Sequence, residues 1–166
     1  EAVYAPNIET AKQLQEPEDF GIQNQAWAIV PRIRELDRFL QKFVTSVGED
    51  QILESHPELC FWGLNGGEAM AHPKESQAGI EERRAVLESL DPSLGEAFDE
   101  AIETLTEPEY APMIGKTQAD DILDALATAY TAKLGAEELE RLPPETESER
   151  DTTLMRDIEI VYYLVE

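Results

Sequence analysis

The chain has 166 residues, of which 42% are hydrophobic, and its net charge of −23 comes from 36 acidic and 13 basic residues. This length and apolar content predict a single domain over residues 1–166, and no apolar run is long enough to suggest membrane association. Such dense negative charge disfavours modules that bind phosphate backbones through basic patches at moderate salt. An acidic surface is typical of halophile proteins. In molar salt the Debye length is about 3 Å, so the repulsion between acidic side chains and phosphates is largely screened. The negative charge therefore does not exclude a metal-dependent enzyme that acts on nucleic acid at high salt.

The first half of the chain is expected to contain helices around one short strand. A helical turn is predicted over residues 8–15, inside an otherwise irregular segment, 1–24. Apolar residues at helical spacing predict an amphipathic helix over 29–44, with Pro31 in its first turn. Residues 51–55 are expected to form a strand. Pro57 then begins a short helix over 57–64, which Gly66 and Gly67 close.

The second half is expected to contain three longer helices and a terminal strand. The helices are predicted over 77–90, 93–105 and 117–134, the last with Thr117 as its N-cap. Residues 107–116 are expected to form a loop and 140–153 a polar connection, before a β-branched and aromatic strand over 158–165. Two strands make a poor sheet. The exposed flank of the terminal strand is therefore a candidate for pairing with a second copy, as in a homodimer.

Three carboxylates are candidate metal ligands. Asp121 and Asp124 are three residues apart and share a helix face with small residues such as Ala125 and Thr128, while Glu54 ends the predicted strand. Carboxylates that converge repel each other unless a cation or a proton intervenes, and hard oxygen ligands suit Mg²⁺ or Mn²⁺. A plainer interpretation remains open, because acids in a first helical turn stabilise the helix dipole without a metal. Asp120 is expected to be an ordinary solvent-facing cap residue.

Four further residues are candidates for supporting roles at this site. His56, with Glu58 beside it, could orient a ligand or carry a proton, although a structural hydrogen bond is the simpler role. Lys74 and Arg83 could contact a substrate phosphate, and surface salt bridges explain them equally well. The single cysteine, Cys60, lies in an apolar run, which predicts a small buried side chain and fits a cytoplasmic protein.

Four blocks of the sequence resemble the family known as domain of unknown function 429, whose members are predicted nucleases with an RNase H-like fold. The blocks are QAWAIVPRI (25–33), ESHPELCFWGLNGG (54–67), HPKESQAGIEERRAVL (72–87) and ADDILDALATAYTA (119–132). The likeness covers nearly the whole chain. The 54–67 block is the most specific, because it is similar to the family's Glu-Val-His-Pro-Glu-x-x-Phe-x-x-Leu-x-Gly-Gly segment. In the third block the likeness rests on Lys74, Gly79 and Arg83.

The resemblance implies an RNase H-like set of catalytic acids. Glu54 matches an acid at the end of the fourth strand, and Asp121 and Asp124 match acids on the last helix. These acids would hold two Mg²⁺ ions, which activate water and stabilise the leaving oxygen in phosphodiester cleavage. The family's first Asp, in a Gly-Ile-Asp strand, has no counterpart before Glu54. The expected fold is therefore α/β, the helix-rich C-terminal portion of an RNase H-like fold with an incomplete sheet, from either a fragment or a truncated homologue.

Two functional hypotheses follow from the sequence. The first is a Mg²⁺- or Mn²⁺-dependent nuclease or phosphodiesterase, acting on RNA, DNA or a small phosphodiester. Without the first acid of the family, this chain alone is expected to bind metal weakly, and its inactivity as a fragment is left open. The second is a non-catalytic domain that works by self-association, motivated by the incomplete sheet. A binder that uses basic patches is poorly supported, because no cluster of basic residues exceeds the pair Arg83 and Arg84.

Overall fold

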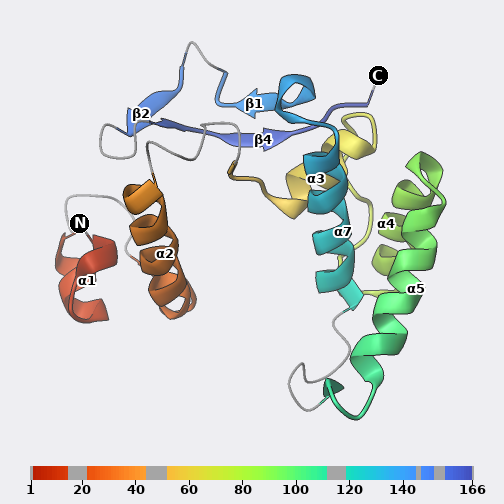
Figure 1. Ribbon diagram of the computed structural model, residues 1–166, viewed down its shortest axis with the longest axis horizontal. Helices are drawn as coiled ribbons and strands as arrows, with labels where there is room; N and C mark the ends of the chain where they lie inside the picture. Colours follow the sequence, from red (N-terminus) through yellow and green to blue (C-terminus); the bar gives the residue numbers. More distant parts are fainter. Residues whose placement is uncertain are drawn as a thin grey trace. The chain divides into compact units, whose positions relative to one another are not determined.

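The computed structural model describes residues 2–14, 22–43, 52–111, 119–144, 147–151 and 156–165. Within these residues the protein is a helix-rich α/β chain with six α-helices and two two-stranded sheets (Figure 1). The chain divides into two compact units, residues 1–52 with 150–156 and residues 53–149 with 157–166. The single domain expected over 1–166 stays a prediction. None of the helices described has the length and apolar character needed to cross a membrane.

The first unit contains the two expected N-terminal helices, α1 (Ile8–Leu14) and α2 (Asn24–Phe43), after a short 3-10 turn, η1 (Ala2–Tyr4). The amphipathic helix begins five residues earlier than predicted, so Pro31 lies inside α2 and not in its first turn. The prediction for Pro31 was therefore wrong. Proline in a helix interior removes one backbone hydrogen bond, and here the helix continues through it.

The apolar face of α2 is largely exposed, in contrast to the burial that its helical spacing suggests. Val30 is buried. Four other apolar side chains of α2 are 40–52% exposed: Ile29, Ile33, Leu36 and Phe39. The opposite side of the helix is tied to the N-terminal turn, because Arg34 donates hydrogen bonds to the backbone carbonyl oxygens of Val3 and Ala5.

The second unit is built on four helices, α3 (Pro57–Leu64), α4 (Gln77–Leu90), α5 (Ser93–Thr106) and α7 (Ala119–Lys133). These confirm the predicted helices to within a few residues, although the expected cap Thr117 lies outside the described residues. Gly66 and Gly67 end α3 with positive φ angles of 67° and 81°, which favour glycine. Helix α7 packs against α3, α4 and α5 (Figure 1), so it is the central helix of this unit.

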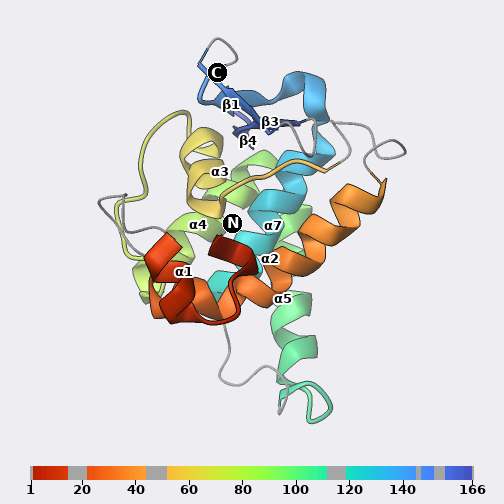
Figure 2. The same ribbon diagram turned by 90° about the vertical axis from the view of Figure 1, so that its left-hand side faces the viewer.

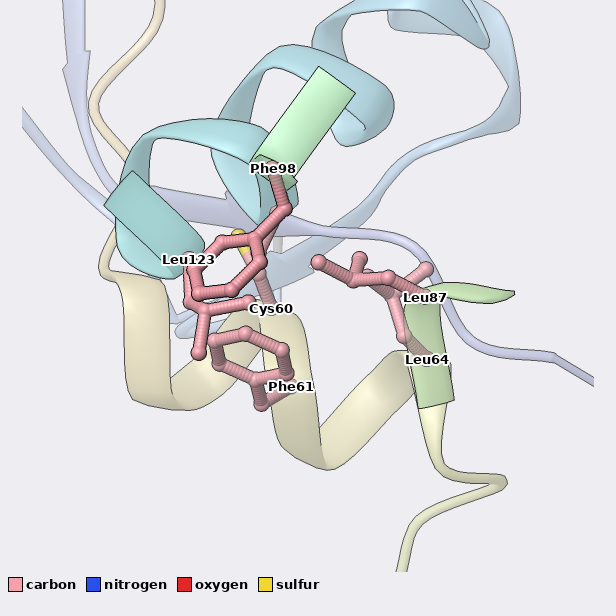
Figure 3. Packing of buried hydrophobic residues seen from close by; sticks show 7 residues of the cluster. Cys60, Phe61, Leu64, Leu87, Phe98 and Leu123 are labelled. Carbon is pink, nitrogen blue, oxygen red and sulfur yellow. The ribbon is translucent and has the colours of Figure 1, made fainter. Parts of the chain in front are cut away.

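The core of the second unit lies between these helices. Figure 3 shows Phe61, Phe98 and Leu123, from three different helices, pointing toward one another. The buried hydrophobic cluster contains Cys60, Phe61, Leu64, Leu87, Phe98, Leu123 and Ala127. Cys60 is fully buried, which confirms the prediction of a small core side chain. Close packing of this kind makes the positions of residues on α3, α4 and α7 rigid relative to each other.

The strands differ from the sequence prediction. In the segment expected to be a strand, 51–55, the described residues 52–55 form one parallel bridge, between Ser55 and Val161. Strand β1 (Glu140–Leu142) pairs antiparallel with β4 (Ile160–Tyr162), and β2 (Glu149–Asp151) pairs with β3 (Arg156–Ile158). The predicted polar connection therefore contains two strands, and the predicted terminal strand is divided between β3 and β4. Within the second unit, strands β1 and β4 lie at one end of α3 and α7 in both views (Figures 1 and 2).

Strand β4 has a partner on each side at Val161. Arg141 of β1 is its antiparallel partner, and on the other side the Val161 amide donates to the Glu54 carbonyl oxygen at 2.8 Å. The Ser55 hydroxyl also donates to the Val161 carbonyl oxygen at 2.7 Å. The expectation that the flank of the terminal strand is open for a second copy was therefore wrong at this residue.

Candidate functional site

Three charged side chains meet beside the first turns of α7. Asp120 and Asp124 are one helical turn apart and therefore lie on the same side of α7. Lys74, from the loop before α4, places its Nζ 2.8 Å from Asp124 Oδ2 and 3.8 Å from Asp120 Oδ2. The side chains of Asp124, Asp120 and Lys74 are 16%, 22% and 32% exposed. These three residues form the aspartate–lysine cluster.

One oxygen of this cluster lacks a partner. Asp124 Oδ1 is buried and has no hydrogen bond among the described residues, whereas Oδ2 accepts from Lys74. The hydrogen bond to Asp124 raises the pKa of Lys74 above its ordinary value, and the negative charges of Asp124, Asp120 and Asp121 add to this effect against partial burial. Lys74 is therefore a cation at neutral pH. A buried carboxylate oxygen without a donor is costly and invites a ligand.

Arg83 and Glu58 form a separate ion pair that supports the structure. Arg83 is 2% exposed, and its Nη2 donates to both carboxylate oxygens of Glu58 at 2.9 Å. Its guanidinium lies over the ring of Phe61, with Cζ 5.5 Å from the centroid. Because the Arg83 side chain is buried between α3 and α4, it is not presented to a substrate. The alternative of an ion pair therefore describes Arg83 better than a phosphate contact.

Of the remaining predicted residues, Asp121 is near enough to the cluster for its charge to act on Lys74, whereas Glu54 and His56 take no part in its ion pairs. Glu54 is exposed and is anchored through its backbone carbonyl oxygen, which accepts from Val161. His56 is exposed at the N-cap position of α3 and makes no side-chain capping bond. Asp121 lies on the exposed side of α7. In the ranges that the structure describes, no group of three or more His, Cys, Asp or Glu is placed to hold a metal ion. The structure thus does not bring Glu54, Asp121 and Asp124 together.

The orientation of α7 explains why Asp120 was missed. The buried stripe of this helix consists of Leu123, Ala127 and Thr131, whereas the small residues Ala125 and Ala132 are exposed. Asp120 and Asp124 flank the buried stripe, so Asp120 is not the solvent-facing residue that the sequence suggested. The spacing of four between the two acids is the signal that could have found this pair. Residues three apart and residues four apart both share a helix face. The sequence therefore could not choose between Asp121 and Asp120 as the neighbour of Asp124 until the buried face of α7 was known.

The fold and this cluster define a helix-rich α/β protein with an acidic, lysine-containing polar site. The sequence model of one family, described as protein of unknown function (DUF429), matches residues 1–148. The chain belongs to this family. Comparisons with curated proteins and with solved structures find no match.

Proposed function

We propose that this protein contributes to the active site of a metal-dependent phosphodiesterase, a nuclease of RNase H-like type. The observation that carries the proposal is the aspartate–lysine cluster, in which Asp124 keeps one buried oxygen without a partner while its other oxygen holds a cation. The resemblance of Glu54, Asp121 and Asp124 to acids of RNase H-like nucleases also supports the proposal, whereas the description of the matched family names no function. Carboxylate oxygens of this kind suit Mg²⁺ or Mn²⁺.

The fit to a metal is partial. Asp124 offers an unpaired buried oxygen and Asp120 a second carboxylate beside it, whereas Glu54 and Asp121 do not complete a group of three within the described residues. We propose Asp124 as the principal ligand, with Asp120 beside it as the further candidate. A bound divalent ion would supply an activated water and stabilise the leaving oxygen.

Lys74 has the clearest role among the residues of the chain. Its side chain is one-third exposed, and its ammonium group already neutralises part of the charge of Asp124 and Asp120. A cation at the edge of an acidic site attracts a phosphate that the surrounding carboxylates would otherwise repel. We propose that Lys74 contacts the substrate phosphate from this position, and that the large negative charge of the whole chain makes molar salt the favourable condition for binding.

The test compares the full chain with Asp124→Asn and with a matched variant, Asp99→Asn, whose carboxylate pairs with Arg84 on the surface. Mn²⁺ binding is measured by electron paramagnetic resonance, and cleavage of labelled RNA and DNA is measured in molar KCl with Mn²⁺. Asp124→Asn should weaken Mn²⁺ binding by at least about tenfold and cleavage by about 100-fold, because a charged oxygen ligand is lost. Asp99→Asn should match the parent.

Absence of Mn²⁺-dependent cleavage by the parent contradicts the proposal. Equal cleavage by the parent and by Asp124→Asn also contradicts it, because the unpaired carboxylate oxygen would then have no part in the reaction.

The exposed face of α2 favours a second candidate, a non-catalytic domain that associates with a copy of itself. Ile29, Ile33, Leu36 and Phe39 are exposed together on one helix, and apolar side chains grouped on a surface are typical of interaction sites. Light scattering tests this function. A dimer that dissociates in the variant Ile33→Glu, with no effect of Mn²⁺ on thermal stability, would favour it. A monomeric parent would exclude it.

A further inference from the structure

The loop that carries Lys74 is held by its backbone. Glu82, on α4, accepts hydrogen bonds from the amides of Ala71 and His72, with N···O distances of 2.8 and 3.0 Å. Arg83, the next residue of α4, donates from Nη1 to the His72 carbonyl oxygen at 3.1 Å. Adjacent residues of one helix thus bind both the amide and the carbonyl of His72. The backbone of His72, two residues before Lys74, is therefore held in place.

A close backbone contact fixes the residue that directly precedes Lys74. A Cβ atom at Gly79 would lie 2.0 Å from the carbonyl oxygen of Pro73, so only glycine permits this approach. The same carbonyl oxygen accepts from the amide and the hydroxyl of Ser76, at 3.0 and 2.7 Å. The Ser76 hydroxyl oxygen in turn accepts from the Gly79 amide and caps α4. The loop is therefore held at His72 by Glu82 and Arg83 and at Pro73 by the start of α4.

These contacts also connect the loop to a second helix. Arg83 also binds Glu58 of α3 through both carboxylate oxygens, so the loop is tied to two of the helices that pack against α7. Lysine has a long side chain with many accessible rotamers. Fixing its backbone does not restrict the rotamers directly, but it sets the distance that the chain must span to reach Asp124.

We propose that Glu82 and Arg83 are positioning residues, whose backbone bonds to Ala71 and His72 hold Lys74 at Asp124 so that its ammonium group is ready for a substrate phosphate. The role of the phosphate rests on the proposed function, whereas the positioning of Lys74 does not. Neither residue touches the substrate in this arrangement. A preorganised cation binds a phosphate without the cost of ordering the loop at each binding event.

The experiment compares Glu82→Gln with Glu81→Gln in the full chain. Glu81 is the matched control because it is the adjacent acid on α4 and is exposed. Among the described residues, its carboxylate accepts a hydrogen bond from the Gln77 side chain only. Nuclear magnetic resonance relaxation of the ¹³C-labelled lysine ε-methylene reports how well ordered the Lys74 side chain is, with the signal assigned by its loss in Lys74→Met. In Glu82→Gln the order of the Lys74 side chain should fall, because a looser loop weakens the hydrogen bond to Asp124. In Glu81→Gln it should not change.

Steady-state kinetics gives a second readout. Glu82→Gln should raise KM for the phosphodiester by about tenfold with a smaller effect on kcat, since substrate binding and not the reacting atoms is disturbed. Arg83→Lys should raise KM less than Arg83→Met does, because lysine can still donate to the His72 carbonyl oxygen and methionine cannot.

The outcomes separate the two proposals. An unchanged order of the Lys74 side chain in Glu82→Gln, or an equal fall in Glu81→Gln, overturns the positioning role even if the protein cleaves nucleic acid. A selective fall in the order of the Lys74 side chain, in a protein without Mn²⁺-dependent cleavage, supports the positioning role and overturns the proposed function.

Discussion

Arg83 and Arg84 are adjacent on α4, but they differ in burial and in the groups that they bind. Arg83 is buried and binds Glu58 and the His72 carbonyl oxygen. Arg84 is one-third exposed and pairs with Glu88 and Asp99 at the surface. Removing a buried partner leaves the other group desolvated and unpaired, whereas water replaces a partner at the surface.

We expect Arg83→Met to lower the free energy of unfolding by about 2–3 kcal/mol. This loss is smaller than the loss on breaking a fully buried ion pair, because Glu58 is partly exposed. Arg84→Met keeps the same side-chain stem and should cost less than about 1 kcal/mol. Urea unfolding followed by circular dichroism measures both. Similar losses in the two variants would show that the burial of Arg83 does not stabilise the fold.

Glu82 should make the stability of the protein depend on pH, and the direction of its pKa shift gives the sign of this dependence. The backbone amides of Ala71 and His72 donate to the Glu82 carboxylate. These hydrogen bonds, that from Ala71 most of all, lower the pKa of Glu82 below its ordinary value of 4.5. Its contribution to stability is therefore complete above pH 4.5 and disappears as the pH falls through the folded-state pKa. At pH 7 Glu82→Gln should be less stable than the parent, and the difference should shrink in acid. Urea unfolding between neutral and acid pH measures this, with Glu81→Gln as the control; a constant difference would contradict it.

Individual residues were predictable from the sequence where the chemistry of one side chain decides the outcome. Cys60 in an apolar run is buried, as predicted. Asp121 and Asp120 show where such prediction ends. Both lie in the first turn of α7, and which of them joins Asp124 depends on the direction from which α3, α4 and α5 approach the helix. That direction is a property of the tertiary packing, so the local spacing of acids cannot supply it.

At the scale of elements, α3 and the segment after β4 approach each other unusually closely. A Cβ atom at Gly63 would lie 2.1 Å from the carbonyl oxygen of Tyr163, and the Gly63 carbonyl oxygen accepts from the Val165 amide at 3.0 Å. The helix therefore rests directly on the backbone of the terminal segment. Any side chain at this position would separate the two elements.

We expect Gly63→Ala to lower the free energy of unfolding by about 1–3 kcal/mol through overpacking, despite the better helix propensity of alanine. Gly95→Ala is the control, since a Cβ there would meet the flexible carboxylate end of Glu88. That variant should change stability by less than about 1 kcal/mol. Thermal unfolding of both proteins checks the prediction, and a neutral Gly63→Ala would mean that α3 shifts freely on the terminal segment.

Helices were predicted well from the sequence, whereas strands were not. The apolar spacing and the end residues of α3, α4 and α5 are local signals, such as Pro57 at the start of α3 and Ser76 at the cap of α4. Strands β1 and β2 have three residues each and consist largely of Glu and Arg, so they have no apolar alternation to detect. The segment 51–55 has a strand-like composition, but its pairing is limited to a bridge that depends on a distant residue.

For the whole molecule, the dominant property is the net charge of −23. Self-repulsion of this charge destabilises the compact state at low ionic strength. Raising KCl from about 0.1 to 1 M shortens the Debye length from about 10 to about 3 Å and removes most of the repulsion between exposed acids. The expectation of a halophilic source stays a prediction, and the salt dependence is its physical consequence.

We expect Tm to rise with KCl, steeply below about 0.5 M and slowly above it, because screening is nearly complete at higher salt. Differential scanning fluorimetry measures this, with sucrose at matched osmolality as the control for general exclusion effects. A Tm that is insensitive to KCl, or that rises equally in sucrose, would show that charge repulsion does not limit the stability of the protein.

The pairing of Ser55 with Val161 joins positions 106 residues apart, and this has a consequence for the nascent chain. Ribosomes add about 5–20 residues per second, so the segment around Ser55 waits roughly 5–20 s before Val161 has been made. During that interval the buried side chains Cys60 and Phe61 lack part of the surface that covers them. We expect the emerging polypeptide to be a chaperone client until synthesis has passed β4.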